Sequence, residues 1–316
     1  MRIWQGSAEA AGQLERPVVT VGNFDGIHLG HRAILETVVE RAREHGGQAV
    51  VYTFDPHPRK VLRQESAPAL LTTTEQKIEL LEAQGVDAVV IEPFTLEFAK
   101  TDPEVFIRDC LHHRIAPTEV YVGYDFHFGR DRKGSMRLLT ELGPRLGFAV
   151  TIIPEVTMDE GDVNSTRIRG LLAEGELEVA GRMLGRPYAV RGRIVTGDQR
   201  GRTIGFPTAN LDSENEVLPS PGVYTGELRF LDAGEPGRES RLPVVTNVGR
   251  RPTFKDGDEV VAEAHVLDWQ GDLYDRKVEL SFSSRIRAEQ KFPGVDALRA
   301  QIARDVAEAK RRLEAS

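Results

Sequence analysis

Two histidines, His28 and His31, lie three residues apart around Gly30 in the stretch VGNFDGIHLGH. The stretch follows a short apolar run, so we expect a strand to end here and a helix to begin. Glycine lets the backbone approach a phosphate closely, a helix N-terminus favours an anion, and imidazole N–H groups can donate to phosphate oxygens. A glycine-rich turn whose histidines only cap the helix explains the same residues equally well, so this stretch alone leaves both interpretations open.

A second cluster of polar residues opens another expected helix, in the stretch VNSTRIRGLL. Asn164 or Ser165 is a natural N-cap. Arg167 and Arg169 follow in the first turn, where cations oppose the helix dipole, and a bound polyphosphate would explain them. Solvated arginines behind an ordinary N-cap remain the simpler explanation of this stretch taken alone.

A glycine-rich loop in the second half precedes two hard oxygen ligands, in GRIVTGDQRGRTIGFPTANL. Gly197, Gly201 and Gly205 follow one another at four-residue steps, and the loop is not a Walker loop because no Gly-Lys-Ser/Thr follows. Thr208 and Asn210 alternate onto one side of an extended segment, and their oxygens suit Mg²⁺ that carries ATP. A long turn with a polar edge strand is the simpler structural alternative.

A carboxylate between small residues is the remaining candidate for chemistry, in VVAEAHVLD. Glu263 and His265 fall on one face of the expected strand, opposite Ala262, Ala264 and Val266. Such a glutamate is either a solvated strand residue or a placed general base. Composition does not choose between the two.

Composition and charge limit the class of protein. The chain has 316 residues, 40% of them hydrophobic and 28% charged, which indicates about two globular domains. The net charge of −8 argues against a nucleic-acid partner, although local phosphate sites are compatible with it. The single cysteine, Cys110, excludes an internal disulfide and a multi-cysteine metal site, and its helical apolar pattern predicts a core thiol.

The chain shows no expected membrane segment. Its first ten residues, MRIWQGSAEA, lack the apolar core of a signal peptide. Apolar runs stay well below the roughly 18 residues that a membrane span requires. We therefore expect a cytoplasmic protein.

The elements that would position these residues differ between the two halves. In the first half, five nearly continuous apolar runs alternate with amphipathic helices, which predicts right-handed crossovers and a parallel sheet. The second expected helix begins with Thr72 and Glu75 in capping-box spacing and ends at Gly85. Ligands bind past the carboxyl ends of such strands, where the histidine pair lies. The runs are PVVTVGNF, QAVVYTFD, DAVVIEPF, EVYVGYDF and FAVTIIPEV.

The second half shows short strands separated by turn residues, which predicts a small antiparallel barrel or sandwich. These strands are YAVRGRIV, VYTGELRFL, RLPVVTNVG, VVAEAHVLD and KVELSFSSRIR. A final helix has an apolar stripe expected to cover the barrel, formed by Val295, Leu298, Ile302, Val306 and Leu313. We place the domain boundary near Leu184, with domains 1–183 and 184–316.

Taken together, these motifs resemble a known family. The H-x-G-H motif, followed by S-T-x-I-R about 130 residues later, is similar to the nucleotidylyltransferase superfamily. TFDPHP and VGYDFHFGRDRKG place aromatic and acidic residues at the same sheet edge, where a flat substrate could stack. The set resembles the N-terminal module of the bacterial bifunctional riboflavin kinase/FMN adenylyltransferases. In the second half, GRTIGFPTAN, VYTG, TNVGRRPTF, EAHVLD, GDLY and RAEQKF recur in the same order in riboflavin kinases.

The resemblance implies a fold class and two reactions. It implies an α/β, Rossmann-like nucleotidylyltransferase domain, followed by an all-β, six-stranded antiparallel riboflavin-kinase barrel with a terminal helix. The barrel would use ATP and Mg²⁺ to convert riboflavin to FMN, and the first domain would join FMN to ATP, giving FAD and pyrophosphate. The implied partners are small-molecule substrates only, without nucleic acid or membrane, and the chain is expected to be a monomer or weak homo-oligomer.

The resemblance also implies roles for individual residues. The implied catalytic residues are Glu263, His28, His31 and Arg169. Those implied to bind ATP for adenylyl transfer are Gly22, Asn23, Phe24, Asp25, Gly30, Ser165 and Thr166. Those implied to form the flavin pocket are Phe54, Asp55, His57, Asp125 and Phe126. Those implied to bind ATP in the kinase are Gly197, Gly201, Gly205, Thr208 and Asn210, the last two also holding the metal.

Two departures from the family pattern are visible. Asn164 stands where the family more often has a serine, and asparagine caps a helix equally well. Asp275 follows GDLY where glycine is usual, which puts the local turn in doubt if that position needs a positive φ. Two alternatives to the bifunctional enzyme stay open: a chain with only one live activity, and a flavin-binding regulator without catalysis.

Overall fold

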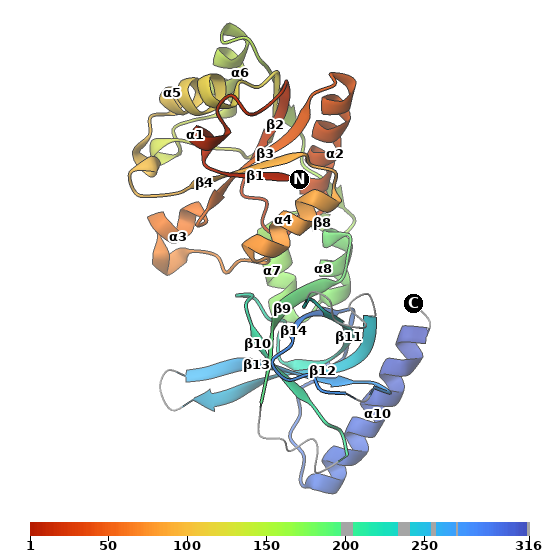
Figure 1. The fold of residues 1–316 in the computed structure, drawn as a ribbon. Helices are drawn as coiled ribbons and strands as arrows, with labels where there is room; N and C mark the ends of the chain where they lie inside the picture. The colour runs from red at the N-terminus through yellow and green to blue at the C-terminus, as the bar shows by residue number, and fades with distance from the viewer. Residues whose placement is uncertain (197–204, 233–240, 254–256, 270, 315–316) are drawn as a thin grey trace. The chain divides into compact units, whose positions relative to one another are not determined.

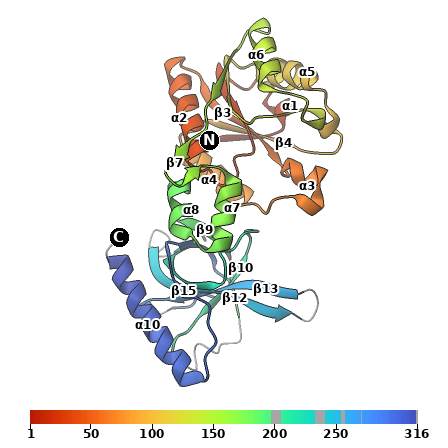
Figure 2. The same cartoon turned by 180° about the vertical axis from the view of Figure 1, so that it is seen from behind.

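The computed structural model describes residues 1–196, 205–232, 241–253, 257–269 and 271–314. Gly197 and Gly201 therefore lie outside the described residues. Contacts divide the chain into two compact units, Met1–Ser165 and Thr166–Ser316. Figure 1 and Figure 2 show an α/β unit followed by a β-barrel unit with a long terminal helix.

The first unit is built on a six-stranded sheet whose neighbouring strands are all parallel, in the order β1-β4-β3-β2-β5-β6. The strands are β1 (Arg2–Gln5), β2 (Pro17–Val21), β3 (Gln48–Asp55), β4 (Ala88–Pro93), β5 (Glu119–Gly123) and β6 (Ala149–Ile153). The five expected strands are confirmed. The edge strand β1 was not predicted, because its four residues RIWQ are mostly exposed and lack an apolar run.

Helices cover both faces of this sheet (Figures 1 and 2). One face carries α2 (Leu29–Glu44) and α4 (Thr74–Ala83), whose buried leucines and valines pack on β2–β4. The other carries α1 (Ser7–Ala10), α5 (Pro103–Val105), the π-helix Phe106–Ile115 and α6 (Met136–Arg145). The remaining elements are α3 (Pro58–Leu62), the 3₁₀ turns 64–66, 98–100 and 130–132, β7 (Thr157–Met158) and β8 (Gly161–Asp162).

The strand order reverses between β2 and β5. The chain runs outward from β2 through β3 to β4, and it then returns to place β5 on the other side of β2. Loops that leave β2 and β5 therefore diverge to opposite faces, which opens a crevice at their carboxyl ends. The histidine stretch follows β2 and the second aromatic stretch follows β5, so topology brings both to this edge.

Two local predictions have clear outcomes in this unit. The capping box of α4 is formed by Thr73 and Gln76, one residue later than the predicted pair Thr72 and Glu75. Thr72 instead donates its hydroxyl to Asp25 Oδ1 at 3.3 Å, so the tertiary contact decides which threonine caps the helix. Cys110 is buried in the core, as predicted, and burial raises the pKa of its thiol.

The second unit is a closed antiparallel barrel. Six strands form a ring in the order β12-β13-β10-β9-β14-β11, and β11 pairs back with β12, while β15 adds to β11. The strands are β9 (Tyr188–Val195), β10 (Ala209–Ser213), β11 (Gly222–Phe230), β12 (Arg241–Thr253), β13 (Gly257–Val266), β14 (Lys277–Phe282) and β15 (Ser284–Ala288). The helices are α7 (Ser165–Glu174), α8 (Leu177–Leu184) and α10 (Val295–Glu314). The six-stranded barrel and its terminal helix are confirmed.

Small residues allow this barrel to close. A Cβ atom added to Gly192 would lie 2.0 Å from the carbonyl oxygen of Asp212, and one added to Gly226 would lie 1.8 Å from that of Ser281. Only glycine fits such an approach of two backbones. These two positions therefore depend on the absence of a side chain.

The terminal helix α10 packs on the outside of the barrel. Ala309 is fully buried and Val306 partly buried against Val223, Val245 and Leu267. The apolar stripe is thus confirmed near its C-terminal end, whereas Val295 at its start is 61% exposed. A buried carboxylate, Asp305, fastens the same helix, because both of its oxygens accept hydrogen bonds from the Arg287 guanidinium on β15.

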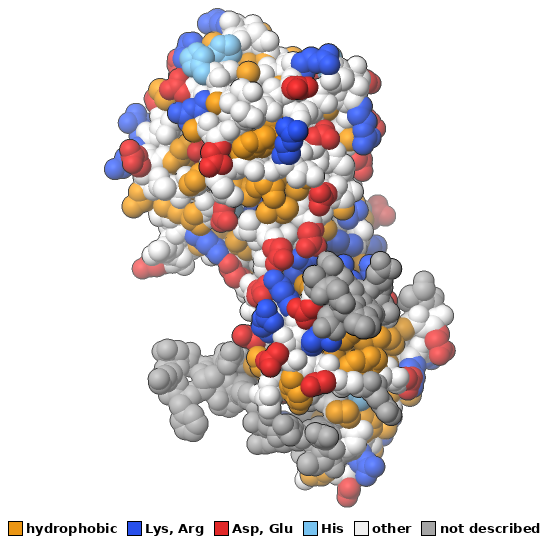
Figure 3. Space-filling view, viewed as in Figure 1, with side chains coloured by type: hydrophobic (Ala, Val, Ile, Leu, Met, Phe, Trp, Pro, Cys, Tyr) orange, Lys and Arg blue, Asp and Glu red, His pale blue; other side chains and the backbone are white. Residues whose placement is uncertain are grey.

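The surface of the described residues is mixed in charge. Figure 3 shows acidic and basic side chains interspersed over one face, consistent with the moderate net charge of −8. Among the helices that the structure describes, we find none with the length and apolarity of a transmembrane segment.

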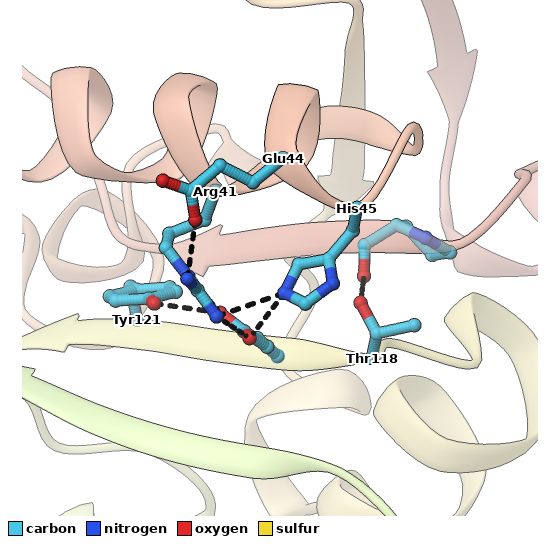
Figure 4. A network of polar contacts seen from close by, with 7 residues as sticks. Arg41, Glu44, His45, Thr118 and Tyr121 are labelled. Atoms are coloured by element: carbon cyan, nitrogen blue, oxygen red, sulfur yellow. Dashed lines mark hydrogen bonds and ion pairs between the residues drawn. The ribbon is translucent and has the colours of Figure 1, made fainter.

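A polar network ties α2 to β5 (Figure 4). Arg41 donates to both carboxylate oxygens of Glu119, at 3.1 and 2.6 Å, and His45 lies 2.8 Å from Oε1 of the same carboxylate. Tyr121 donates its hydroxyl to Glu119 as well, at 2.7 Å. These hydrogen bonds, that of Arg41 first, lower the pKa of Glu119 from 4.5 to about 2.

The Glu119 network predicts a pH-dependent contribution to stability. Because the folded pKa lies below the unfolded value, the contribution is complete above pH 4.5 and is lost as the pH falls towards 2. Glu119→Gln should lower the free energy of unfolding by about 1–2 kcal/mol at pH 7, after allowance for solvent screening. Urea unfolding at several pH values measures this. A difference between the two proteins that stays constant down to pH 2 would contradict it.

The close approach at Gly226 predicts a steep cost for any side chain there. Gly226→Ala should destabilise the protein by about 1–3 kcal/mol, because one of two hydrogen-bonded strands must move. Gly170→Ala is the matched control: a Cβ there meets no atom within 4 Å, and alanine favours the helix by roughly 0.5–1 kcal/mol. Thermal unfolding followed by circular dichroism compares them, and equal effects of the two changes would refute the steric explanation.

Candidate active sites

The loop that leaves β2 is held in one strained shape. Phe24 and Ile27 have left-handed φ values of 50° and 43°, and Gly26 has a φ of 85°. Both non-glycine side chains are buried in the core between the sheet and α4, so packing balances the backbone strain. Gly22 begins the loop with a hydrogen bond from its N–H to the Tyr52 carbonyl at 3.1 Å.

His28 is the N-cap of α2. Its Nδ1 accepts a hydrogen bond from the backbone N–H of His31 at 3.3 Å, which satisfies one of the free donors of the first turn. An Nδ1 atom that accepts is unprotonated, so neutral His28 carries its proton on Nε2. The cap thereby makes the outer edge of the ring a hydrogen-bond donor.

His31 stacks on His28. The two rings lie 3.7 Å apart at an interplanar angle of 20°, and Phe24 contacts the His31 ring at 5.0 Å. Burial, the neighbouring His28 and the charge of Lys77 lower the pKa of His31 well below 6.5, so this ring is neutral at pH 7. Its buried Nδ1 has no hydrogen-bond partner among the described residues. The pair thus places two stacked imidazoles, of which that of His31 is neutral, at a helix N-terminus, an arrangement that suits a phosphate.

The structure brings the VNST stretch to the histidine stretch. A Cβ added to Gly30 would lie 3.2 Å from both the His28 ring and the Val163 carbonyl oxygen, so the two backbones meet at this glycine. Ser165 donates its hydroxyl to the Asp25 carbonyl oxygen at 2.9 Å. Helix α7 begins at Ser165, which leaves Asn164 in the preceding N-cap position.

The other predicted residues of this stretch belong to the second unit. Thr166 is exposed and Arg169 half-buried, and both lie in the first turns of α7. Their roles remain predictions.

Asp25 holds the loop in place. The side chain is only 4% exposed, and its carboxylate accepts hydrogen bonds from the backbone N–H groups of Leu71 and Thr72, at 2.9 and 3.2 Å. The carboxylate thus links the β2–α2 loop to the segment that leads into α4. Asn23, by contrast, is exposed.

The five predicted flavin residues lie at the carboxyl ends of two strands: Phe54 and Asp55 end β3, His57 follows it, and Asp125 and Phe126 follow β5. Phe54 lies at the edge of an aromatic cluster, 5.8 Å from Phe94 and 6.2 Å from Phe98, and Phe126 stacks on Phe128 at 5.4 Å. Both phenylalanines pack in or against one apolar core.

The three polar members of this set lie beside that aromatic edge. Asp55 and Asp125 are exposed, and His57 caps α3. Asp55 accepts a hydrogen bond from the Thr74 hydroxyl at 3.1 Å, which ties the end of β3 to the start of α4.

Sequence reasoning missed Lys77. This lysine lies in the first turns of α4, and its charge acts on His31. Burial lowers its pKa, while Asp25 and Asp55 raise it. A lysine early in a helix that opposes the dipole was the available signal, the same one that singled out Arg167 and Arg169.

The barrel places three polar residues in one row. Glu263 on β13 is the register partner of Asn210 on β10 and of Asn247 on β12, so the three side chains share one face of the sheet. The predicted alternation is confirmed, because Ala262 and Ala264 on either side are buried. Asn247 was not predicted, since its register with Glu263 depends on strand pairing.

The row offers oxygen ligands of the kind that Mg²⁺ prefers. Thr208 and Asn210 are half-buried, and their side chains make no hydrogen bond within the part of the chain that the structure describes. A hydroxyl, an amide oxygen and a nearby carboxylate form a donor set that fits this ion together with nucleotide phosphates. Gly205, the one described glycine of the loop, has a φ of 87° and no atom within 4 Å of an added Cβ.

Asp275 adopts the conformation that the sequence put in doubt. Its φ is 57°, the left-handed region in which glycine is usual. Two hydrogen bonds hold it there: its N–H donates to the Ile194 carbonyl at 2.9 Å, and its carbonyl accepts from Arg193 at 2.8 Å. Aspartate tolerates this region better than most residues, so the turn forms.

Comparison with known proteins assigns a family to each half of the chain. A family model described as FAD synthetase matches residues 11–167, and one described as riboflavin kinase matches residues 184–313. The chain is 41% identical over 290 residues to the bifunctional riboflavin kinase/FMN adenylyltransferase of Escherichia coli strain K12, covering 91% of this chain and 90% of that protein. The protein of the same name from Haemophilus influenzae is 37% identical, with 98% of each chain covered.

A solved structure shares the fold. It is a crystal structure named as a macrolide-efflux protein from Streptococcus pneumoniae, 29% identical, with a TM-score of 0.85 and 98% of each chain covered. Its name and those of the curated relatives differ in activity, so this likeness is used for the fold alone.

The buried histidine pair predicts an unusual titration. In an NMR titration, the ring protons of His31 should keep their neutral positions well below pH 6.5, because burial and His28 disfavour the charged form. His28→Ala should raise the pKa of His31, since it removes a neighbouring ring whose electrostatic effect lowers that pKa. A His31 that titrates at 6.5 or above in the unaltered protein would contradict the arrangement described.

Proposed function

Because the chain belongs to the family of bifunctional riboflavin kinase/FMN adenylyltransferases, we propose that it makes FAD from riboflavin in two ATP-dependent steps. The observation that carries the proposal is that both halves of the chain match their family models and each half holds residues suited to its step. We assign adenylyl transfer to residues 1–183 and the kinase to residues 184–316.

In the kinase step, the ribityl 5′-hydroxyl of riboflavin attacks the γ-phosphorus of ATP. Glu263 orients this hydroxyl and accepts its proton, the bond from the γ-phosphorus to the bridging oxygen breaks, and ADP leaves. Its place in the row with Asn210 and Asn247 supports this role, because a base must be held rigidly against the reacting oxygen. The glycine loop, with Gly197, Gly201 and Gly205, covers the nucleotide.

The kinase step also requires that the charge of the phosphates be offset. Thr208 and Asn210 would hold Mg²⁺, which supplies this neutralisation when bound. Both residues are half-buried, and the place of Asn210 opposite Glu263 supports the assignment. The protein's own contribution is to align these oxygens with the base.

In the adenylyl step, a phosphate oxygen of FMN attacks the α-phosphorus of a second ATP. The bond to the β-phosphate breaks, and pyrophosphate leaves. His28 and His31 donate hydrogen bonds to the phosphate oxygens as charge develops on them. The cap that fixes the proton of His28 on its outer nitrogen supports this role.

Further residues bind the two substrates of this step. Ser165, Thr166 and Arg169 grip the phosphates, while Gly22, Asn23, Phe24, Asp25 and Gly30 shape the nucleotide side. Since the Asp25 carboxylate is buried and hydrogen-bonded to backbone, its contribution is to hold the loop. Phe54, Asp55, His57, Asp125 and Phe126 form the flavin pocket beside the aromatic cluster.

The protein's partners follow from these reactions. We propose that it acts in the cytoplasm on riboflavin, FMN and ATP, as a monomer or weak homo-oligomer, and without nucleic acid or membrane. The net charge of −8 disfavours a polyanion partner.

Two substitutions should separate the activities. Glu263→Gln should lower kcat for FMN formation by about 10²–10⁴-fold while FMN is still converted to FAD, because it removes only the base of the barrel. His31→Ala should lower FAD formation from FMN by about 10²–10³-fold and leave FMN formation intact. Chromatography of flavins after incubation with ATP and Mg²⁺ measures both.

The unaltered protein supplies the control in the same assay. It should convert riboflavin to FMN and then to FAD. Accumulation of FMN without FAD would favour a chain with one live activity, and tight flavin binding without either product would favour a regulator. Equal damage to both reactions by either substitution would contradict the assignment of the two domains.

A further inference from the structure

We infer that His265 is a positioning residue of the kinase step, which clamps the Phe206–Pro207 segment so that Thr208 stays aligned with Asn210 and Glu263. The inference rests on the proposed kinase function. His265 lies on β13 two residues beyond Glu263 and on the same face of the strand, about 7 Å further along it.

The clamp consists of two contacts. His265 Nδ1 lies 2.8 Å from the carbonyl oxygen of Pro207. A carbonyl oxygen only accepts, so the imidazole is the donor and carries its proton on Nδ1. The ring of Phe206 meets the His265 ring edge to face, at 5.6 Å and 81°, which fixes the imidazole plane from the same segment.

The sequence explains why a side chain is needed here. The pairing of β10 with β13 begins at Ala209, opposite Ala264. Pro207 lacks an N–H group, so it cannot donate to the ladder, and the segment before Ala209 needs another attachment. Gly205, which precedes Phe206, has a positive φ, and a Cβ added there would meet none of the described residues within 4 Å. The histidine bond therefore holds the chain at the point where backbone pairing stops.

The contacts of His265 affect the position of Thr208 relative to Glu263. Thr208 lies between the clamped carbonyl and the first paired residue, so its backbone is held from both sides. Without the clamp, the segment and the Thr208 hydroxyl would shift relative to Glu263 and to the paired Asn210. Phosphoryl transfer depends almost entirely on positioning, and a displacement of about 1 Å costs up to roughly 10²-fold in rate.

Replacing His265 by asparagine or by glutamine tests this inference, because the two side chains hold their amide N–H at different distances from the backbone. The side-chain N–H of asparagine replaces the Nδ1–H of histidine, whereas that of glutamine lies where Nε2 was. His265→Gln should therefore lower kcat for FMN formation by about 10–100-fold with KM for riboflavin unchanged. His265→Asn should recover most of that kcat. Conversion of FMN to FAD and the melting temperature should be the same for both variants, and His113→Gln, at an exposed site in the other unit, controls for the exchange itself.

A spectroscopic readout needs no substrate. Long-range ¹⁵N–¹H spectra should show that neutral His265 is protonated at Nδ1, and an Nε2–H tautomer would overturn the inference. Unchanged kcat in His265→Gln, or equal losses in the asparagine and glutamine variants, would overturn it as well. A failed kinase assignment is distinguishable, because the unaltered protein would then form no FMN at all.

Discussion

One hydrogen bond, from a backbone N–H to a side chain, determines the character of the proposed adenylyl-transfer site. When His31 N–H donates to His28 Nδ1, it caps α2, fixes the His28 tautomer and places the second ring against the first. The remaining features of the loop serve that geometry: two buried side chains with positive φ hold its turn, and the Asp25 carboxylate fastens it to the start of α4. Removal of the cap would disturb the helix start and the orientation of the donors at once.

The two proposed sites position their side chains in different ways. In the first unit, a reversal of strand order creates the crevice, and loops carry the reactive groups to it. In the barrel, the groups lie on paired strands, and register alone sets Asn210, Glu263 and Asn247 side by side. Loops can reshape around a nucleotide, whereas a row on three bonded strands is rigid before any substrate arrives.

Much of this could be predicted from the sequence, for identifiable reasons. Buried parallel strands are long apolar runs, so β2–β6 were found, and alternation along β13 placed Glu263 correctly relative to its neighbours. Predictions were wrong or missing where tertiary contacts decide. Thr73 caps α4 in place of the predicted Thr72, because the Thr72 hydroxyl donates to Asp25. β1 was missed because an exposed edge strand has no apolar signature.

Other features of the candidate sites depend on neighbours far along the chain. Lys77 lowers the pKa of His31 through its charge. Asn247 belongs to the polar row of the barrel because it pairs with Glu263. The left-handed φ of Asp275 was recognised as a question because glycine is usual there, yet the two hydrogen bonds that stabilise it come from β9 and could not be read from its own segment.

The single thiol of this chain has a practical consequence. Cys110 lies within the aromatic and aliphatic core of the first unit, and burial keeps it in the protonated, unreactive form. Reagents that alkylate thiolates will therefore not modify Cys110 in the native protein. A cysteine introduced on the surface would be the one labelled position, so a fluorescent or paramagnetic reporter could be attached to either unit without first removing a native residue.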